Sequence, residues 1–461
     1  MSRYTHLTDD ERREMLAEIG VERLEDLFAD IPEAVRLDRP LDLPDGLSEQ
    51  EVYLHLRDLA ERNVCTDDEV SFVGAGMYDH YVPALVEAII GRSEFLTPYT
   101  PYQPEISQGG LQAMFEYQTA ISELTGLPVS NASVYEGPSA LGAAGYLARQ
   151  SRAGRKFVVS RGVHPHSRET LATMSAGWGT SIEEVALRDG ATDLDVLTRA
   201  VDEHTAAVFL QQPNFLGSVE DLEALATAAK RTGAVVVCAC DPLPLAIIEP
   251  PGACGVDIAV GEGQTLGNRL DFGGPSFGFF AATEEYLRKM PGRIAGETHD
   301  VDGRRGFVLT LQTREQHIRR EKATHNICTA QALNALAGVI YLSWLGRRGI
   351  VELAELMLQR TAYAREALAR VDGVSPAHSQ PVVREFAVTV DAPVERVVER
   401  CQEQGVNPGL PIGEDYPELG VGALLVAVTE QRTREHVDRL AAALGAAVAA
   451  ERAGGRVEAP A

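Results

Sequence analysis

Two short segments of the chain carry residues of the types that bind a phosphorylated cofactor. Gly137, Pro138 and Ser139 open a predicted helix of small residues, and the free N–H groups of a helix N-terminus bind phosphate. Asp241 follows a predicted buried strand, 234–239, where a carboxylate can keep a pyridine nitrogen protonated. Each segment taken alone could equally be an ordinary helix cap or the end of a strand. Together they predict two of the three anchors of a pyridoxal phosphate (PLP) site.

The third anchor, a lysine that holds PLP as a Schiff base, is missing. It should lie on the loop after the next predicted strand, 256–261, where Gln264 and Thr265 occur instead. An amide or a hydroxyl cannot form a Schiff base. The chain's four lysines are Lys156 and Lys230, which precede Asp241, and Lys289 and Lys322, which lie in charged stretches. We therefore predict a degenerate PLP site made of Gly137, Ser139, Asp241, Gln264 and Thr265.

The elements that would position these residues alternate between helix and strand. Predicted strands cover 156–160, 182–187, 206–211, 234–239, 256–261 and 277–281, and predicted helices cover 110–125, 138–149, 167–175, 193–202 and 219–231. Such alternation is typical of a mostly parallel sheet with helices on both faces. The predicted fold class is α/β, with the large domain of a fold-type I PLP-dependent transferase.

The pattern divides the chain into three predicted parts. Residues 1–65 form a polar helical arm that is too charged to build its own core. Residues 66–330 form the large domain. Residues 331–461 begin with long helices that reach 371 and continue as a small α/β domain, with strands at 382–390 and 423–428 and helices at 394–404 and 433–450.

An aromatic, proline-rich segment precedes the first helix of the large domain. It contains Tyr99, Thr100, Tyr102, Gln103, Glu105, Ser107 and Gln108. Long loops with many large side chains are usually functional. We expect these residues to line a binding pocket, with packing of a subunit interface as the alternative.

Other candidate groups are weaker. The six cysteines lack paired spacing, and His164 and His166 have no carboxylate or thiol cluster at ligand spacing, so no metal site is predicted. Arg304, Arg305, Arg314, Arg319 and Arg320 form a basic stretch with His317. A solvated face is the default interpretation, and an anion contact is the alternative.

The charge balance limits the partners. Asp and Glu number 67 against 42 Lys and Arg, which gives a formal net charge of -25. Nucleic acid and anionic membranes are excluded because their phosphates are repelled by such a surface. The acidic, lysine-poor composition predicts a salt-rich, halophilic cytoplasm, with a codon bias for Arg as the alternative. No signal peptide is recognised at the N-terminus, and the uncharged stretch 324–346 is expected to be a buried helix.

Several longer motifs resemble one known family. They are Ser71-Phe-Val-Gly-Ala-Gly, the Thr97-Pro-Tyr-Thr-Pro-Tyr-Gln-Pro-Glu-Ile-Ser-Gln-Gly109 segment, Thr125-Gly-Leu-Pro-Val-Ser-Asn-Ala-Ser133, Phe272-Gly-Gly-Pro275, and 303–329. The chain resembles the P-protein (glycine decarboxylase) of the glycine cleavage system from about residue 1 to 450. Its length and its missing lysine match the N-terminal-type half, called subunit 1.

The resemblance implies the following function. The enzyme decarboxylates glycine with PLP and transfers the aminomethyl group to the lipoyl arm of H-protein. PLP is bound covalently by the partner, subunit 2, and not by this chain, and two copies of each subunit form an α2β2 assembly. Tyr99, Tyr102 and Glu105 would line the partner's catalytic site, with Thr100, Gln103, Ser107 and Gln108 beside them. Two alternatives remain: a non-catalytic scaffold that binds H-protein, and a self-sufficient PLP enzyme that uses an atypical lysine such as Lys322.

Overall fold

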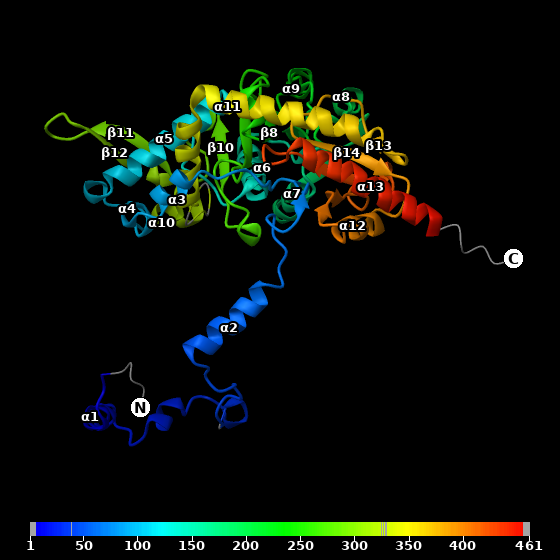
Figure 1. Ribbon diagram of the computed structural model, residues 1–461. Coiled ribbons are helices and arrows are strands. Elements are labelled where there is room, and N and C mark those ends of the chain that lie inside the picture. Colours follow the sequence, from blue (N-terminus) through cyan, green and yellow to red (C-terminus); the bar gives the residue numbers. More distant parts are fainter. Residues whose placement is uncertain (1–5, 38, 324, 326, 328–329, 455–461) are drawn as a thin grey trace. The chain divides into compact units, whose positions relative to one another are not determined.

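The computed structural model describes residues 6–37, 39–323, 325, 327 and 330–454, and these divide into two compact units, 1–64 and 65–461. Figure 1 shows the chain coloured along its sequence. The predicted division into three parts stays a prediction.

The first unit consists of short polar helices. Helix α1 (Asp9–Ile19) begins at Thr8, whose side chain accepts a hydrogen bond from the backbone N–H of Glu11, and α2 (Glu49–Ala60) begins at Ser48 with the same reciprocal cap. Short 3-10 turns lie at Leu24–Phe28 and Glu33–Val35. Leu16 is the only buried side chain among the described residues of this unit, as the polar composition of the arm predicts.

The second unit is built on a seven-stranded sheet. Five parallel strands form its centre: β9 (Ile258–Glu262), β8 (Val235–Cys240), β7 (Thr205–Gln212), β3 (Lys156–Ser160) and β4 (Ser181–Val185). Beyond β9, β10 (Gly278–Ala282) runs antiparallel to β9, and β2 (Val129–Ser130) pairs antiparallel with β10, so β2 has the same direction as the five parallel strands. The predicted large, mostly parallel sheet is confirmed.

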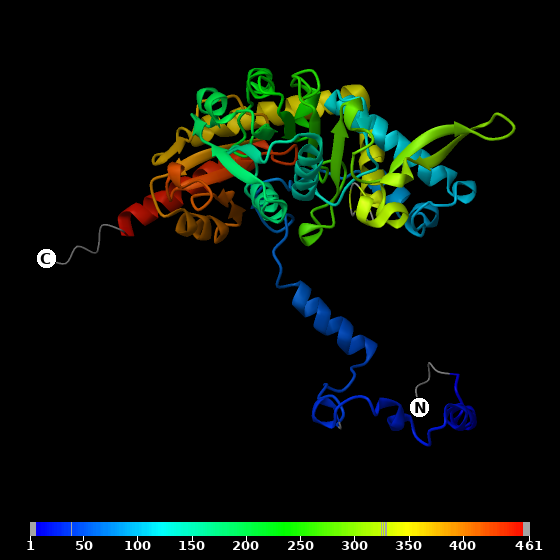
Figure 2. The same cartoon turned by 180° about the vertical axis from the view of Figure 1, so that it is seen from behind.

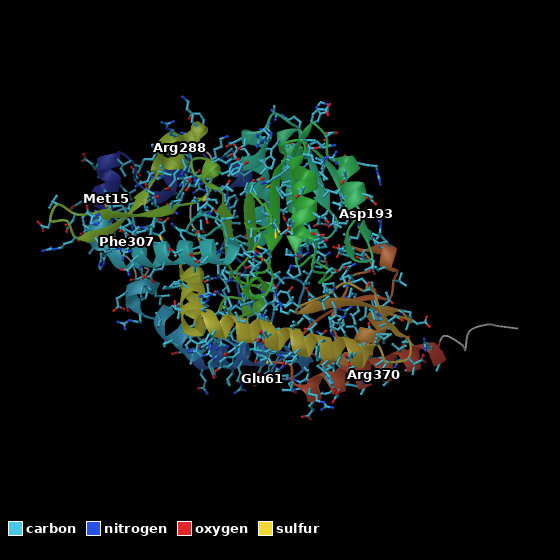
Figure 3. The ribbon with its side chains drawn as sticks, turned by 90° about the horizontal axis from the view of Figure 1, so that it is seen from above. Met15, Glu61, Asp193, Arg288, Phe307 and Arg370 are labelled. Atoms are coloured by element: carbon cyan, nitrogen blue, oxygen red, sulfur yellow. The ribbon has the colours of Figure 1, made fainter. Side chains whose placement is uncertain are left out.

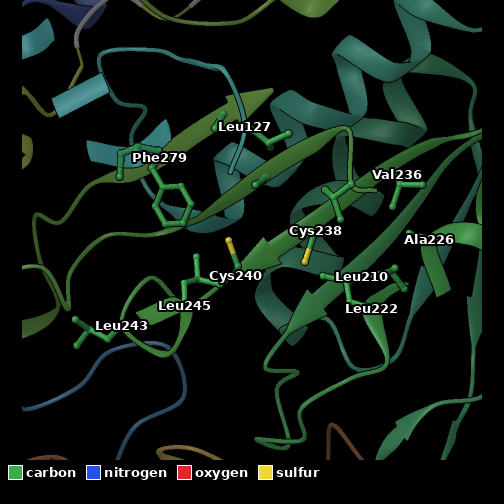
Figure 4. Close-up of a cluster of buried hydrophobic side chains, with 14 of the residues drawn as sticks. Leu127, Leu210, Leu222, Ala226, Val236, Cys238, Cys240, Leu243, Leu245 and Phe279 are labelled. Atoms are coloured by element: carbon green, nitrogen blue, oxygen red, sulfur yellow. The ribbon is translucent and has the colours of Figure 1, made fainter. Parts of the chain in front are cut away.

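Successive side chains of each strand point to opposite faces of the sheet, and apolar side chains occupy both faces. Helices therefore cover both of them. Val235 and Val237 pack with α6 (Gly137–Ser151) and α7 (Pro165–Trp178). Val236 and Cys238 belong to the opposite core, shown in part in Figure 4. Helices that contribute to that core include α5 (Gln108–Thr125), α8 (Leu194–Ala200), α9 (Leu222–Lys230) and α11 (Ala332–Leu368). Cys238 and Cys240 are buried strand residues, as predicted.

The C-terminal part forms a second, smaller sheet. Its antiparallel strands are β13 (Val374–Pro376), β14 (Glu385–Val390), β17 (Ala423–Ala427) and β16 (Leu410–Pro411). Helices α12 (Val394–Gln402) and α13 (Arg434–Gly454) pack with them around one core. A two-stranded parallel pair, β1 (Val70–Ser71) with β15 (Val406–Asn407), ties the start of the unit to this part. Figure 2 shows this region from behind.

The longest strand pair that was not predicted is a hairpin in the second unit. Strands β11 (Ile294–His299) and β12 (Arg305–Thr310) form a hairpin that packs on α5, and Figure 3 marks Phe307 on it. The unit also contains several short elements. They are the helices α3 (Ala84–Ile90), α4 (Ser93–Leu96) and α10 (Gln316–Arg319), the small hairpin of β5 (Leu187–Arg188) with β6 (Ala191–Thr192), and scattered 3-10 turns. The hairpin and α13 lie at opposite ends of the unit in Figures 1 and 2.

Candidate functional site

A cavity of about 510 Å³ lies at the carboxyl ends of β7, β8 and β9. Gly137, Asp241 and Thr265 line it together, so the structure gathers three residues of the predicted degenerate site. Ser139 and Gln264 do not line the cavity. They belong to its supporting structure.

The phosphate anchor at the start of α6 is already occupied by the chain's own carboxylates. The N–H of Gly137 donates to Glu262 Oε2 at 3.0 Å, and the N–H of Ser139 donates to Glu136 Oε1 at 3.0 Å. Glu136 is the N-cap residue of the helix. A phosphate at this point would lose two donors and meet two negative charges. The predicted helix start is confirmed, but its free donors are not available.

The carboxylate meant for a ring nitrogen is also engaged. Asp241 forms an ion pair with Arg384, whose side chain is 3% exposed. The guanidinium lies over the ring of Tyr78, with its carbon 3.4 Å from the ring centroid, and contacts His80. His80 in turn bonds Glu430 at 2.7 Å. Asp241 therefore neutralises an arginine from the C-terminal part.

The position expected for lysine holds two buried side chains with different roles. Gln264, 1% exposed, accepts from the N–H of Tyr78 at 2.9 Å and donates to the carbonyl oxygen of the same residue. It fixes the 75–78 segment over the cavity. Thr265 is 2% exposed, and its hydroxyl has no hydrogen-bond partner among the described residues.

The residues present therefore do not fit PLP. The phosphate donors are used, the ring-nitrogen partner is paired, and none of the four lysines is among the described residues that line the cavity. Lys156, for example, donates to Asp202 at 2.7 Å and to Glu183 at 3.1 Å. The alternative of a self-sufficient PLP enzyme has no support in this geometry.

Next to the cavity wall, Glu385 carries a pH-dependent contribution to stability. Its carboxylate accepts from the N–H of Ala75 and the hydroxyl of Tyr78, each at 2.7 Å. Burial raises its pKa from 4.5 to about 7. The folded state therefore binds the proton more tightly than the unfolded chain. This contribution is fully present below pH 4.5 and is lost as the pH rises through about 7.

We expect Glu385→Gln to flatten this pH dependence, because the amide keeps an acceptor for Ala75 and does not titrate. Urea unfolding at about pH 5 and about pH 8 measures the change, and the loss of stability between these values should be smaller in the variant than in the wild type. Equal slopes in both proteins would show that Glu385 ionises as an ordinary carboxyl group.

The two histidines at 164 and 166 stand in the cavity wall and not in a metal cluster. His164 Nε2 donates to the carbonyl oxygen of Ala75 at 2.9 Å, and its Nδ1 accepts from the N–H of His166 at 3.1 Å. Burial lowers the pKa of His164 to about 4, so the ring is neutral. Within the described part of the chain, no group of metal-ligating side chains of the required size is found.

The loop before α5 forms a second candidate region, away from the cavity. Tyr102 accepts a hydrogen bond from Arg293 at 3.2 Å, and its ring lies edge-on to His317 with centroids 5.2 Å apart. Gln108 bonds both the N–H and the carbonyl oxygen of Phe307 on β12, at 2.8 and 2.9 Å. The loop is thus anchored at two points by its own side chains.

Between and before these anchors, the loop presents its other residues to the surface. Tyr99 is 78% exposed, Gln103 and Glu105 are exposed, and Thr100 and Ser107 are half-buried. Tyr99 and Ser107 also line an apolar cavity of about 320 Å³ with residues of α5 and α11. The structure therefore groups the seven predicted loop residues on one segment, and their role in a binding site stays a prediction.

The basic stretch does not form one face. Arg304 and Arg305 lie at the exposed end of the hairpin, where Arg305 pairs with Glu297. Arg314 is 4% exposed and donates to the carbonyl oxygen of Gly292 at 3.1 Å. A solvated face is thus wrong for Arg314, because the turn after β12 carries it inside. Its neighbour His325 is buried too, and burial lowers the pKa of that imidazole to about 4.

The residues that sequence reasoning missed are Glu136, Glu262 and Arg384. Glu136 directly precedes the predicted helix, and acidic side chains are favoured near the positive end of the helix dipole, which is a readable signal. Glu262 ends its strand next to Asp241, because β8 and β9 are parallel neighbours that pair Ala239 with Val260. Arg384 had no local signal, since it lies in the C-terminal part.

The uncharged stretch 324–346 includes residues outside the described ones, and α11 begins within it at Ala332. Among the described residues, no helix is both long and apolar enough to cross a membrane.

Comparison with known proteins agrees with this geometry. The family model of the glycine cleavage system P-protein matches residues 2–444. A probable glycine dehydrogenase (decarboxylating) subunit 1 from Desulforamulus reducens is 49% identical over 95% of this chain and 98% of its own length. The protein of that name from Carboxydothermus hydrogenoformans is 50% identical over 96% of this chain and 99% of its own length.

Solved structures extend the comparison to the fold. A crystal structure of glycine decarboxylase (P-protein) of the glycine cleavage system, in inhibitor-bound form, superposes with a TM-score of 0.87 at 44% identity, covering 97% of this chain and 100% of that chain. A cysteine desulfurase from Escherichia coli superposes with a TM-score of 0.64 at 17% identity, covering 86% of this chain and 98% of that one. The predicted fold-type I architecture is confirmed.

Proposed function

Because this chain belongs to the glycine cleavage system P-protein family, we propose that it is subunit 1 of a glycine dehydrogenase (decarboxylating). The observation that carries the proposal is the loss of all three cofactor anchors in a fold that otherwise keeps the cofactor cavity. A subunit of this kind needs a second chain that supplies the PLP. PLP contributes the electron sink for decarboxylation when it is bound, and we assign its covalent attachment to the partner, subunit 2.

The part of this chain in catalysis is proposed to be the loop 97–108. Its base is fixed by Tyr102 and Gln108, while Tyr99 and Glu105 face outward. An anchored loop with exposed aromatic and polar groups is suited to reach into a neighbouring chain's site, where it would orient glycine and exclude water. Thr100, Gln103 and Ser107 would supply further hydrogen-bonding groups beside these residues.

The remaining partners follow from the same proposal. Glycine's aminomethyl group would pass to the oxidised lipoyl arm of H-protein, where a C–S bond forms as the lipoyl disulfide bond breaks, and two copies of each subunit would form an α2β2 assembly. A cytoplasmic location is proposed with them. Neither nucleic acid nor an anionic membrane is a suitable partner, because the net charge of -25 repels phosphate.

Reconstitution tests the proposal. We expect release of carbon dioxide from carboxyl-labelled glycine when this chain, subunit 2, PLP and lipoylated H-protein are combined, and no release when either subunit is omitted. Full activity of subunit 2 alone would reduce this chain to a scaffold. Activity of this chain alone with PLP would overturn the assignment of the cofactor to the partner.

A second prediction concerns salt. We propose that the acidic surface is adapted to a salt-rich cytoplasm, where screening removes repulsion among the carboxylates. Lowering KCl from about 1 M to about 0.1 M, which lengthens the Debye length from about 3 Å to about 10 Å, should reduce the free energy of unfolding in urea. The same experiment in isosmotic sucrose controls for crowding and water activity. Unchanged unfolding across the salt series would favour the codon-bias alternative.

A further inference from the structure

The first unit, residues 1–64, presents more apolar side chains to solvent than the much longer second unit. Among the described residues, 18 large apolar side chains are exposed in the first unit and 15 in the second. In the first unit their exposed fractions run from 38% for Leu54 to 73% for Val35, and Leu16 is the only one of its described residues that is buried. The unit therefore has the apolar side chains of a core without a core of its own.

The two α-helices of this unit are nevertheless specified at their starts. The N–H of Thr8 donates to Glu11 at 2.8 Å, and the N–H of Ser48 donates to Glu51 at 2.8 Å. Each hydroxyl accepts in return from the N–H of that glutamate. Helix α1 has 11 residues and α2 has 12, and helices of this length are marginal in water unless one face packs against something else. The sequence thus prepares both helices for packing that the unit does not provide.

Helix α2 shows which face would pack. Val52, Leu56 and Leu59 are 40%, 57% and 39% exposed, and their spacing places them on one face of the helix. No residue of α2 is buried. Tyr53 lies off this face, because neighbouring residues are about 100° apart around a helix. An apolar stripe of this kind is what a helix lays into an apolar groove of a partner.

The amount of exposed apolar surface fits a second protein chain. A large apolar side chain offers about 60–120 Å² when fully exposed, so 18 half-exposed ones offer about 500–1,100 Å² together. A standard protein interface takes about 800 Å² from each partner. A small ligand would cover only a part of this surface, whereas the face of another chain would cover most of it.

The charge of the unit narrows the choice of chain. Residues 1–64 contain 17 Asp and Glu against 8 Lys and Arg, a net charge of -9, which leaves 50 against 34 and a net charge of -16 for the rest of the chain. Like charges in contact oppose binding. A second copy of this chain is acidic in both units, and an anionic membrane is negative too, so both are disfavoured. The complementary surface is an apolar groove with arginine or lysine along its rim.

We propose that the first unit docks on subunit 2, in such a groove, with the face of Val52, Leu56 and Leu59 turned into it. This inference rests on the function proposed above, which requires a second chain. The first unit would hold the two chains together, while the loop 97–108 would reach the reacting groups. Binding energy and positioning would thus come from different parts of subunit 1.

Hydrogen exchange read by mass spectrometry tests the docking on the full-length chain, alone at two concentrations and in complex with subunit 2. We expect the amides of α1 and α2 to exchange rapidly in the free chain and at least about tenfold more slowly in the complex. Slow exchange at both concentrations of the free chain would mean that the unit packs on its own chain. Slow exchange only at the higher concentration would mean that a second copy covers it. Either result would overturn the proposal.

A pair of substitutions tests the proposed face. Leu56→Gln with Leu59→Gln keeps good helix formers and removes the apolar ends of two exposed side chains, so the free chain should fold as before. The dissociation constant for subunit 2 should rise about tenfold or more. The matched control is Leu194→Gln with Leu358→Gln, leucines on α8 and α11 that are 41% and 39% exposed, and Tyr53→Ala is a second control off the face. Both controls should bind as the wild type does, and a wild-type affinity of the Leu56 and Leu59 variant would refute the docking.

Carbon dioxide release from carboxyl-labelled glycine, measured on the same samples, separates this inference from the proposed function. An active complex whose first unit still exchanges rapidly would refute the docking and leave the function standing. A protected first unit in a complex that does not decarboxylate glycine would refute the function and leave the docking standing. If subunit 2 does not bind this chain, both are wrong.

Discussion

Replacing Arg384 by Met is expected to lower the free energy of unfolding by about 3–5 kcal/mol, the usual effect of removing one partner of a buried ion pair. The substitution leaves Asp241 in the cavity wall without its guanidinium and also removes the cation that lies over Tyr78. Arg384 is 3% exposed, so solvent does not replace the lost contact. Urea unfolding of wild type and variant at one pH and one KCl concentration measures the difference.

Two comparisons make this result specific. Adding Asp241→Asn to Arg384→Met should recover a large part of the loss, because the remaining partner is then uncharged. Arg348→Met is the matched control: Arg348 pairs with Glu352 on the surface of α11, with its side chain 92% exposed, and such pairs contribute only about 0–1 kcal/mol. If Arg384→Met is no more destabilising than Arg348→Met, Asp241 is not neutralised as the geometry indicates.

In the assembled enzyme, Tyr102→Ala is expected to reduce kcat/KM for glycine about 10- to 100-fold. It removes the hydrogen bond from Arg293 and the ring contact with His317. The loop between Tyr99 and Glu105 then loses its fixed base, and a shift of about 1 Å in a positioning group is enough for such an effect. The exchange of carbon dioxide into glycine, measured with saturating H-protein, gives the change.

The design separates catalysis from assembly. Tyr102→Phe removes only the hydroxyl and should cost a few-fold at most, while Tyr53→Ala, a 66% exposed tyrosine on α2, should have no effect. Gel filtration must show the same complex for each variant. Wild-type exchange in Tyr102→Ala with assembly intact would mean that the loop only packs the subunit interface.

Most of the fold could be predicted from the sequence, but less of the candidate site could. The central strands of the large sheet and the helices between them followed from local periodicity, and Asp241 could be found because it follows the uninterrupted apolar strand β8. The β11–β12 hairpin was missed because its strands mix charged and apolar residues, and its stability comes from packing on α5. Local patterns do not report such tertiary support.

The hydrogen bonds and ion pairs in the cavity wall join residues that are far apart in the sequence. Arg384 lies 143 positions beyond Asp241, and Glu262 lies 125 positions beyond Gly137. The sequence contains only four lysines, so the absence of a lysine at the expected position could be seen directly. That Glu262 bonds the start of α6 and that Arg384 pairs with Asp241 could be known only from the structure. A lysine at Thr265 alone would therefore not restore a PLP site.

We propose that PLP is held by the partner and not by this chain. The direct test is borohydride reduction of the PLP-loaded complex, followed by separation of the subunits and peptide mass spectrometry. We predict a phosphopyridoxyl group on a lysine of subunit 2 and none on Lys156, Lys230, Lys289 or Lys322. Stoichiometric modification of any of these four lysines would contradict the claim.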